Sequence, residues 1–255
     1  MEGLSKVYGE RQAVDGLTFT VEPGDILGMV GPNGAGKTTT MRCVAGVLPP
    51  TSGRVRVAGF DVAEQPIEAK RRLAIVPDDP NLFTGLTVWE HLRFTADVYG
   101  VEGWKTRADR LLEELQMTER GDSLAEELSR GMRQKVAVAC ALLHEPSALL
   151  LDEPLTGLDP RGIRTLYDAL RRRAAEGAGV LLSSHLLGQI EGLCTRFLIV
   201  GEGRRLFLGS KQEIRAELGE LREEASLEEI FFQATEGGAP RPAPAEGSRE
   251  AEPGT

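Results

Sequence analysis

Residues 31–39 read Gly31-Pro32-Asn33-Gly34-Ala35-Gly36-Lys37-Thr38-Thr39. This run fits the G-x-x-x-x-G-K-[ST] pattern of a loop that binds the phosphates of a nucleoside triphosphate. Its glycines allow a tight backbone turn, so successive N–H groups can point at phosphate oxygens without a side chain in the way. We expect Lys37 to reach the β- and γ-phosphates and the hydroxyl of Thr38 to bind Mg²⁺.

The segments on either side of this loop support the same interpretation. Residues 25–30 form an apolar run that predicts a buried strand, and residues 37–47 predict a helix whose N-terminus faces the phosphates. A glycine-rich turn that matched the pattern by chance would not require a strand before it and a helix after it. The sequence therefore predicts a nucleoside triphosphate-binding site here.

The composition is that of an ordinary globular protein. The net charge of −9 argues against a nucleic-acid partner, because nucleic-acid binders present clustered Lys and Arg. Cys43, Cys140 and Cys194 lie far apart without C-x-x-C spacing, which predicts free thiols in a reducing compartment. No signal peptide and no membrane-spanning apolar run is expected, so any role at a membrane would require a partner subunit.

Apolar strands alternate with helical patterns along most of the chain. This alternation predicts parallel strands joined by helical crossovers. Further strands are expected at residues 17–21, 73–76, 148–153, 179–183, 196–200 and, as an edge strand, 204–208. Helices are expected at residues 161–175, 186–193 and 226–234.

Two regions depart from this alternation. Between residues 84 and 145 apolar residues recur at helical spacing, which predicts a helical subdomain inserted between two strands of the core. Residues 236–255 are almost entirely Gly, Pro, Ala and Glu, and we expect this tail to be disordered. The folded domain is accordingly expected to span residues 1–235.

Two carboxylates end the apolar strand that lies about 115 positions after the lysine of the phosphate loop. Asp152 stands where a phosphate-loop protein needs a carboxylate for the Mg²⁺ hydration shell. Glu153 can accept a proton from a water molecule aimed at the γ-phosphorus. The alternative is an acid pair that caps a helix near Pro154.

The segment 128–134, Leu-Ser-Arg-Gly-Met-Arg-Gln, completes a recognisable set of motifs. With the phosphate loop and the two carboxylates, it resembles the nucleotide-binding subunit of ABC (ATP-binding cassette) transporters over residues 3–235. The resemblance implies a P-loop NTPase core of the α/β class with a mostly parallel sheet, an N-terminal antiparallel β subdomain and an inserted helical subdomain.

In that family the signature segment clamps the γ-phosphate of ATP on the opposite subunit, so that two cassettes dimerise head to tail around two ATP molecules. Ser129 and Gly131 match the family motif. Arg130 and Met132 replace the second-position glycine and the closing glutamine of the commonest form of the motif. Arg130 either directs positive charge toward phosphate or points to solvent, and we expect the latter.

Three further positions match family motifs. Asp159 resembles the aspartate of the loop that crosses the dimer seam, and His185 resembles the switch histidine that contacts the γ-phosphate. Tyr8 matches the aromatic residue that stacks on adenine, although an ordinary surface tyrosine is the alternative. His91 and His144 lack such a context, and we expect both to be structural.

Two features depart from the family pattern. Asp78, in the run Pro77-Asp78-Asp79-Pro80, stands where the family places the Q-loop glutamine. Its carboxylate is either an additional Mg²⁺ ligand, with an altered rate or Mg²⁺ dependence, or a turn former before Pro80. The first strand, normally placed before Leu4, is expected to be nearly absent.

The resemblance implies a Mg²⁺-dependent ATPase subunit that powers a separate multi-span membrane permease. It would be peripheral, held by the permease at the cytoplasmic face of the cell membrane, and paired with an identical or paralogous cassette. Exposed Phe83 or Trp89 would suit the groove that receives the permease, although either could be core. Residues 226–231 resemble bacterial single-cassette exporters, which favours export over import. The alternative is a soluble ABC-type ATPase that acts on the ribosome or DNA.

Overall fold

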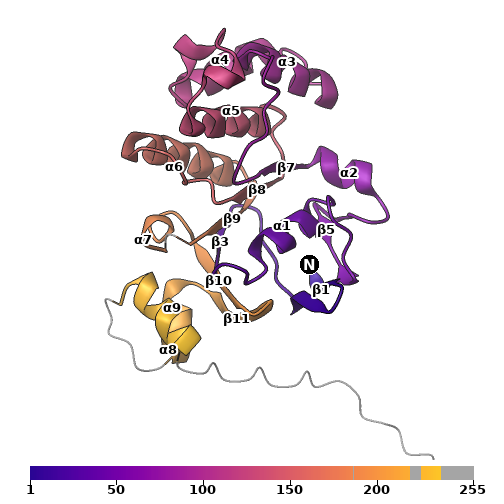
Figure 1. The fold of residues 1–255 in the computed structure, drawn as a ribbon, viewed down its shortest axis with the longest axis vertical. Helices are drawn as coiled ribbons and strands as arrows, with labels where there is room; N and C mark the ends of the chain where they lie inside the picture. Colours follow the sequence, from indigo (N-terminus) through magenta and orange to yellow (C-terminus); the bar gives the residue numbers. More distant parts are fainter. Residues whose placement is uncertain (186, 219–224, 237–255) are drawn as a thin grey trace, which may run out of the picture.

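The computed structural model describes residues 1–185, 187–218 and 225–236, and the part of the chain so described is organised around a six-stranded sheet (Figure 1). The strand order is β11-β10-β3-β9-β8-β7. Strands β10, β3, β9, β8 and β7 run parallel, and β11 joins β10 antiparallel as the expected edge strand. The strands are β3 (Ile26–Val30), β7 (Leu73–Val76), β8 (Ala148–Asp152), β9 (Gly179–Ser184), β10 (Arg196–Gly201) and β11 (Arg204–Gly209).

The carboxyl ends of the parallel strands bring the motif residues together. Strand β3 leads into the phosphate loop and then into α1 (Lys37–Val44). Asp78 follows β7, Glu153 follows β8, and His185 follows β9. Because parallel strands all end at the same edge of a sheet, residues far apart in the sequence meet there.

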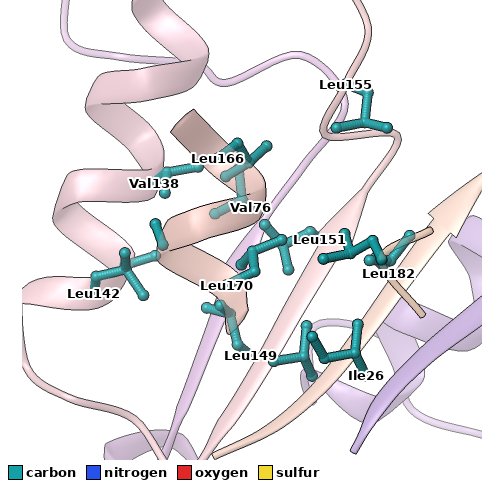
Figure 2. Close-up of a cluster of buried hydrophobic side chains, with 14 of the residues drawn as sticks. Ile26, Val76, Val138, Leu142, Leu149, Leu151, Leu155, Leu166, Leu170 and Leu182 are labelled. Carbon is teal, nitrogen blue, oxygen red and sulfur yellow. The ribbon is translucent and has the colours of Figure 1, made fainter. Parts of the chain in front are cut away.

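Both faces of the sheet are covered, which explains why its strands are apolar on both sides. On one face, Leu149 and Leu151 pack with α5 (Arg130–Leu143) and α6 (Pro160–Ala175), as Figure 2 shows. Leu150 points to the opposite face, where it joins the cluster that contains α1 and the small N-terminal sheet. This alternation follows from the two-residue repeat of a strand.

Three helices lie between β7 and β8 and gather at the upper end of the molecule in Figure 1. They are α3 (Val88–Tyr99), α4 (Trp104–Glu114) and α5, with 3-10 turns at Thr118–Arg120 and Ala125–Glu127. The start of α3 is fixed by a capping box, in which the Thr87 hydroxyl accepts from the Glu90 N–H and the Glu90 carboxylate accepts from the Thr87 N–H. The helical insertion is therefore present, while its limits as a subdomain stay a prediction.

The N-terminal region differs from two expectations. Strand β1 (Glu2–Tyr8) is well formed, so the prediction of a nearly absent first strand is wrong. It pairs antiparallel with β2 (Arg11–Leu17) and with β4 (Ser52–Arg54), and the resulting sheet is the expected antiparallel β subdomain. Residues 18–21 do not form the predicted strand. Their apolar alternation reflects the burial of Leu17 and Phe19 in an extended connection, without a sheet ladder.

Smaller elements complete the described chain. The hairpin β5 (Arg56–Val57) and β6 (Phe60–Asp61) and helix α2 (Pro66–Arg71) precede β7. Helices α7 (Leu187–Ile190), α8 (Lys211–Leu218) and α9 (Leu227–Glu236) follow β9, and α9 corresponds to the last predicted helix. None of the helices in the described residues has the length and apolar character needed to cross a membrane. Apart from Glu236, which ends α9, the predicted tail at 236–255 lies outside the described residues.

Candidate nucleotide-binding site

A pocket of about 430 Å³ opens at the carboxyl edge of the sheet, beside the start of α1. It combines residues of the phosphate loop with residues of the β1–β2 hairpin, the end of β7 and the end of β8. The lining residues are Tyr8, Arg11, Ala13, Asn33, Gly34, Gly36, Lys37, Thr38, Thr39, Asp78 and Glu153. Of the residues predicted to bind ATP, Gly31, Pro32 and Ala35 do not line this pocket.

The phosphate loop requires glycine at position 36. Gly36 has φ 98°, and a Cβ added there would lie 2.4 Å from the carbonyl oxygen of Ala13. Such a position excludes any larger residue, because the left-handed backbone and the close approach both disfavour a side chain. Helix α1 begins at the next residue, so its unpaired backbone N–H groups and its positive dipole end lie at the loop.

Lys37 is held inside the loop. Its Nζ donates to the carbonyl oxygen of Gly31 at 2.6 Å and to that of Pro32 at 3.3 Å, and the side chain is buried. Burial lowers the pKa of Lys37, while the nearby charges of Glu153 and Asp152 act in the opposite direction. The loop therefore places one ammonium group close to two carboxylates at the inner end of the pocket.

The hydroxyl of Ser183 contacts both of these acidic residues. Asp152 and Ser183 are opposite each other in the β8–β9 register, and the Ser183 Oγ donates to Asp152 Oδ1 at 2.5 Å. The same Oγ accepts from the backbone N–H of Glu153 at 3.0 Å. Ser183 is fully buried. One hydroxyl therefore orients the Asp152 carboxylate and holds the backbone of Glu153 at the end of β8.

Glu153 and His185 form a direct contact. Glu153 Oε2 lies 2.7 Å from His185 Nδ1 and accepts from the His185 backbone N–H at 3.2 Å. Within the described part of the chain, Oε1 of Glu153 has no hydrogen-bond partner. Glu153 also has φ 48°, which is strained for a residue with a side chain. The turn after β8 thus aims this carboxylate at the histidine and at the pocket.

Thr38 and Asp152 provide oxygen donors suited to Mg²⁺. The Thr38 side chain lines the pocket, and the Asp152 carboxylate is buried and oriented by Ser183. The described residues contain no cluster of three His, Cys, Asp or Glu that would hold a metal. Such a cluster is not needed, because Mg²⁺ beside a nucleotide takes one or two protein oxygens, phosphate oxygens and waters. The donor set therefore fits Mg²⁺.

The signature residues lie away from the pocket of their own chain. Ser129 is the N-cap of α5, and its Oγ accepts from the Met132 N–H at 3.3 Å. Gly131 sits so close to the loop after β8 that an added Cβ would lie 2.7 Å from the Gly157 carbonyl oxygen. None of these residues lines the described pocket. The backbone start of α5 thus faces outward, beside Gly157.

Arg130 contacts Asp78 rather than pointing freely into solvent. Its Nη2 donates to Asp78 Oδ1 at 2.9 Å, and the two side chains are 45% and 50% exposed. Arg130 is exposed, and this contact adds a partner that our expectation for it did not include. The expectation rested on its surface position, and that position does not reveal a partner 52 residues away. Asp78 also lines the pocket, and a role for it in binding Mg²⁺ stays a prediction.

Asp159 has a clear local role. It is the N-cap of α6, where its Oδ1 accepts from the Gly162 N–H at 2.8 Å. Asp159 precedes Pro160, and a proline at the first helical position is favoured because its missing N–H would be unpaired there anyway. The capping contact explains why an aspartate stands at the start of α6. The predicted place of Asp159 at a dimer seam stays a prediction.

The other two histidines have structural contacts. His91 is buried, and its geometry assigns Nδ1 as donor to the Thr87 carbonyl at 2.7 Å and Nε2 as acceptor from the Phe83 N–H at 3.0 Å. His144 stacks on Tyr99 with ring centroids 3.7 Å apart. Burial is the main reason that the pKa of His144 is lowered.

Three residues at the site were not predicted from the sequence. Arg11 and Ala13 line the pocket, and Arg11 pairs with Tyr8 across the β1–β2 hairpin. The two-residue spacing of Arg11 and Ala13, next to a predicted nucleotide contact, was the available signal. Ser183 gave a weaker signal, because its role depends on the β8–β9 register.

This geometry defines the class of the protein. A parallel sheet carries a phosphate loop, an aspartate and a glutamate at strand ends and a histidine after the next strand, and helices are inserted between β7 and β8. These are the features of an ATPase of the P-loop class.

Comparison with known proteins supports the same class and assigns the family. The ABC transporter family matches residues 14–156. The chain is 37% identical over 219 residues to the Nod factor export ATP-binding protein I of Paraburkholderia xenovorans (strain LB400), covering 85% of this chain and 72% of the relative. It is 35% identical over 237 residues to the ABC-type transporter ATP-binding protein EcsA of Bacillus subtilis (strain 168), covering 92% and 95%.

A solved structure agrees with these relatives. The structure of an ATP-binding subunit of an ABC transporter superposes with a TM-score of 0.87 at 36% identity, covering 92% of this chain and 98% of that one. The chain belongs to the ABC transporter family as an ATP-binding protein, and the predicted family resemblance is confirmed. Proteins of this family bind and hydrolyse ATP.

Proposed function

We propose that this chain is the Mg²⁺-dependent ATP-hydrolysing subunit that powers a separate multi-span membrane permease, and that the transport direction is export. The observation that carries the catalytic part is the 2.7 Å contact between Glu153 and His185, next to the pocket that contains Lys37. A carboxylate at this place, oriented by a histidine, on a backbone held by Ser183, is suited to receive a proton from an attacking water.

Each residue then has a defined part. The Lys37 ammonium and the N–H groups at the start of α1 bind the phosphates, and Tyr8 provides an aromatic face for the adenine. Thr38 and Asp152 would hold Mg²⁺, with Asp78 as a further candidate. When bound, Mg²⁺ neutralises phosphate charge. Glu153 takes the water's proton on Oε1, since its Oε2 is engaged by His185.

A second cassette would complete the site. Ser129 and Gly131 lie at the exposed start of α5, outside the pocket of their own chain. Unpaired helix N–H groups of this kind bind anions, so they suit the γ-phosphate of a nucleotide held by another cassette. Asp159 would lie at the seam between the two chains. The partner is an identical chain or a paralogous cassette.

The permease would bind an apolar groove between the sheet and α3. This groove has a volume of about 560 Å³, and its lining includes Phe83, Phe94 and Tyr99, which are 56%, 50% and 39% exposed. Trp89 does not line the groove, because it packs against Trp104 and Gly121. Exposed aromatic surface of this kind marks a protein contact.

The proposed location and direction follow from this contact and from the relatives. A subunit held by the permease would be peripheral, at the cytoplasmic face of the cell membrane. One relative's name contains the words Nod factor export, and the matched structure is described as a subunit of a transporter. The acidic net charge of −9 gives no support to a nucleic-acid partner.

The test is light scattering after size exclusion on the Glu153→Gln variant, with and without Mg-ATP. The substitution removes the proton acceptor and keeps the side-chain shape, so the variant is expected to bind ATP, fail to hydrolyse it and form a stable dimer. Hydrolysis at the wild-type rate would overturn the catalytic assignment. Cosedimentation with ribosomes or DNA, in place of cofractionation with a multi-span membrane protein, would overturn the permease assignment.

A further inference from the structure

The ion pair between Asp78 and Arg130 joins two segments that act in different places. Asp78 lies in the Pro77-Asp78-Asp79-Pro80 run after β7, and it lines the nucleotide pocket with Lys37 and Glu153. Arg130 is the first residue of α5 and belongs to the outward-facing signature segment. The 2.9 Å contact from Arg130 Nη2 to Asp78 Oδ1 therefore connects the pocket to the helix start.

The Arg130 side chain is also held at its base. A Cβ added to Gly157 would lie 3.2 Å from Cδ of Arg130 and 3.4 Å from its Cγ, so the aliphatic part of the arginine lies over this glycine. Gly157 has φ 82°, which favours glycine for a second reason. With its stem on the loop after β8 and its guanidinium on Asp78, Arg130 has two independent contacts within its own chain.

The charges around the pocket indicate what the Asp78–Arg130 contact does. Asp78 adds a carboxylate to a pocket that receives negatively charged phosphates, and the carboxylate and the phosphates repel each other. Glu153 is engaged by His185, and Lys37 donates to loop carbonyl groups. Among the described residues, Arg130 is the cation that forms an ion pair with Asp78.

We propose that Arg130 is a positioning residue for the nucleotide pocket of its own chain, where its ion pair neutralises and orients the carboxylate of Asp78. This inference rests on the proposed function, because it assumes that the pocket binds ATP. Two departures from the family pattern then compensate for each other: the carboxylate at position 78 is tolerated because an arginine stands at position 130. Both side chains are about half exposed, so the effect on ATP binding is modest.

A double-mutant cycle tests this role. Arg130→Met keeps the aliphatic stem over Gly157 and removes the charge, whereas Asp78→Asn removes the carboxylate charge with little change in shape. The dissociation constant for Mg-ATP is measured by calorimetry in a Glu153→Gln background, so that the readout is binding and not turnover. We expect Arg130→Met to weaken binding about two- to fivefold, the range of an exposed ion pair. In chains with Asp78→Asn, the same substitution is expected to have no effect.

The matched control is Arg93→Met. Arg93 forms an exposed ion pair with Asp97 at 3.7 Å, within α3 and away from the pocket. Its replacement removes a similar exposed pair in the same helical region, and ATP binding should stay unchanged. Added salt screens the exposed Asp78–Arg130 pair. It should therefore weaken ATP binding more in chains that keep both side chains than in chains that carry both Asp78→Asn and Arg130→Met.

Two results would overturn the proposal. If Arg130→Met weakens binding equally with Asp78 and with Asn at position 78, Arg130 acts on phosphate directly or only supports the fold. If it has no effect in either background, the pair is a surface contact without a role in binding. The proposed function fails separately, through ATP turnover that does not depend on Glu153, and that outcome leaves the binding cycle interpretable.

Discussion

Two side-chain contacts of acidic residues at the same edge of the sheet differ in their surroundings. Glu153–His185 and Asp78–Arg130 have nearly equal lengths, 2.7 and 2.9 Å. The Glu153 carboxylate is only 15% exposed and follows a residue fixed by Ser183, whereas Asp78 is 50% exposed. Solvent screens the exposed charge of Asp78 more than that of Glu153, and the buried Ser183 hydroxyl holds the strand end from which Glu153 follows. We therefore expect the Glu153 contact to contribute more to activity than the Asp78 contact.

Replacing His185 should have the largest effect. His185→Ala removes the Nδ1 partner of Glu153, so the carboxylate loses its orientation toward the attacking water. We expect the ATP hydrolysis rate to fall by roughly a hundredfold or more, the scale of a lost acid–base contribution, while Mg-ATP binding stays close to that of the wild type. Steady-state ATPase assays with a parallel binding titration measure the two effects. A loss of only a few-fold would remove the contrast with Arg130→Met.

The second prediction compares the exposed start of α5 with its packed body. Cys140 lies on α5, and burial raises the pKa of its thiol to about 11. A raised pKa keeps the thiol protonated, and only the thiolate is nucleophilic. At pH 8 alkylation of Cys140 should therefore be about a hundredfold slower than that of a free thiol, rising about tenfold per pH unit up to about pH 11.

Peptide mapping by mass spectrometry after timed alkylation measures this rate, with the urea-unfolded chain as the reference. If the native chain reacts at pH 8 as fast as the unfolded chain, the thiol is not held in an environment that raises its pKa, and the contrast between the start of α5 and its body fails at this position.

The third prediction concerns the buried Ser183 hydroxyl, which contacts Asp152 and Glu153. Ser183→Ala removes the donor to Asp152 and the acceptor for the Glu153 N–H, so the apparent Mg²⁺ affinity in ATP hydrolysis should fall by about tenfold, as for other groups that orient metal ligands. Ser183→Thr retains a hydroxyl and should recover most of that loss. Equal loss in both variants would indicate that packing at position 183, and not the hydroxyl, supports the site.

Much of the fold and site was predictable because the responsible signals are local. The apolar runs of β3, β8 and β9, the glycine spacing of the phosphate loop and the acid pair after β8 lie within short segments. Their placement at one edge then follows from parallel connectivity. The segment at residues 18–21 was misjudged, because apolar alternation records burial and does not record which backbone groups form a ladder. The first strand was misjudged because its expected position came from the family pattern, whereas the strand here spans Glu2–Tyr8.

The contacts that shape the site were harder to predict because they join distant residues. Asp78 and Arg130 are 52 positions apart, and Ser183 is 31 positions from Asp152. Tyr8 and Arg11 meet the phosphate loop only because the N-terminal sheet packs beside α1. The motifs and their spacing in the chain were enough to recognise the family, which the comparisons confirm, and through that resemblance to predict the nucleotide and the main site residues. The partners of Arg130, Asp152 and Glu153 emerged only from the fold, because strand register and helix packing decide which distant side chains come within hydrogen-bonding range.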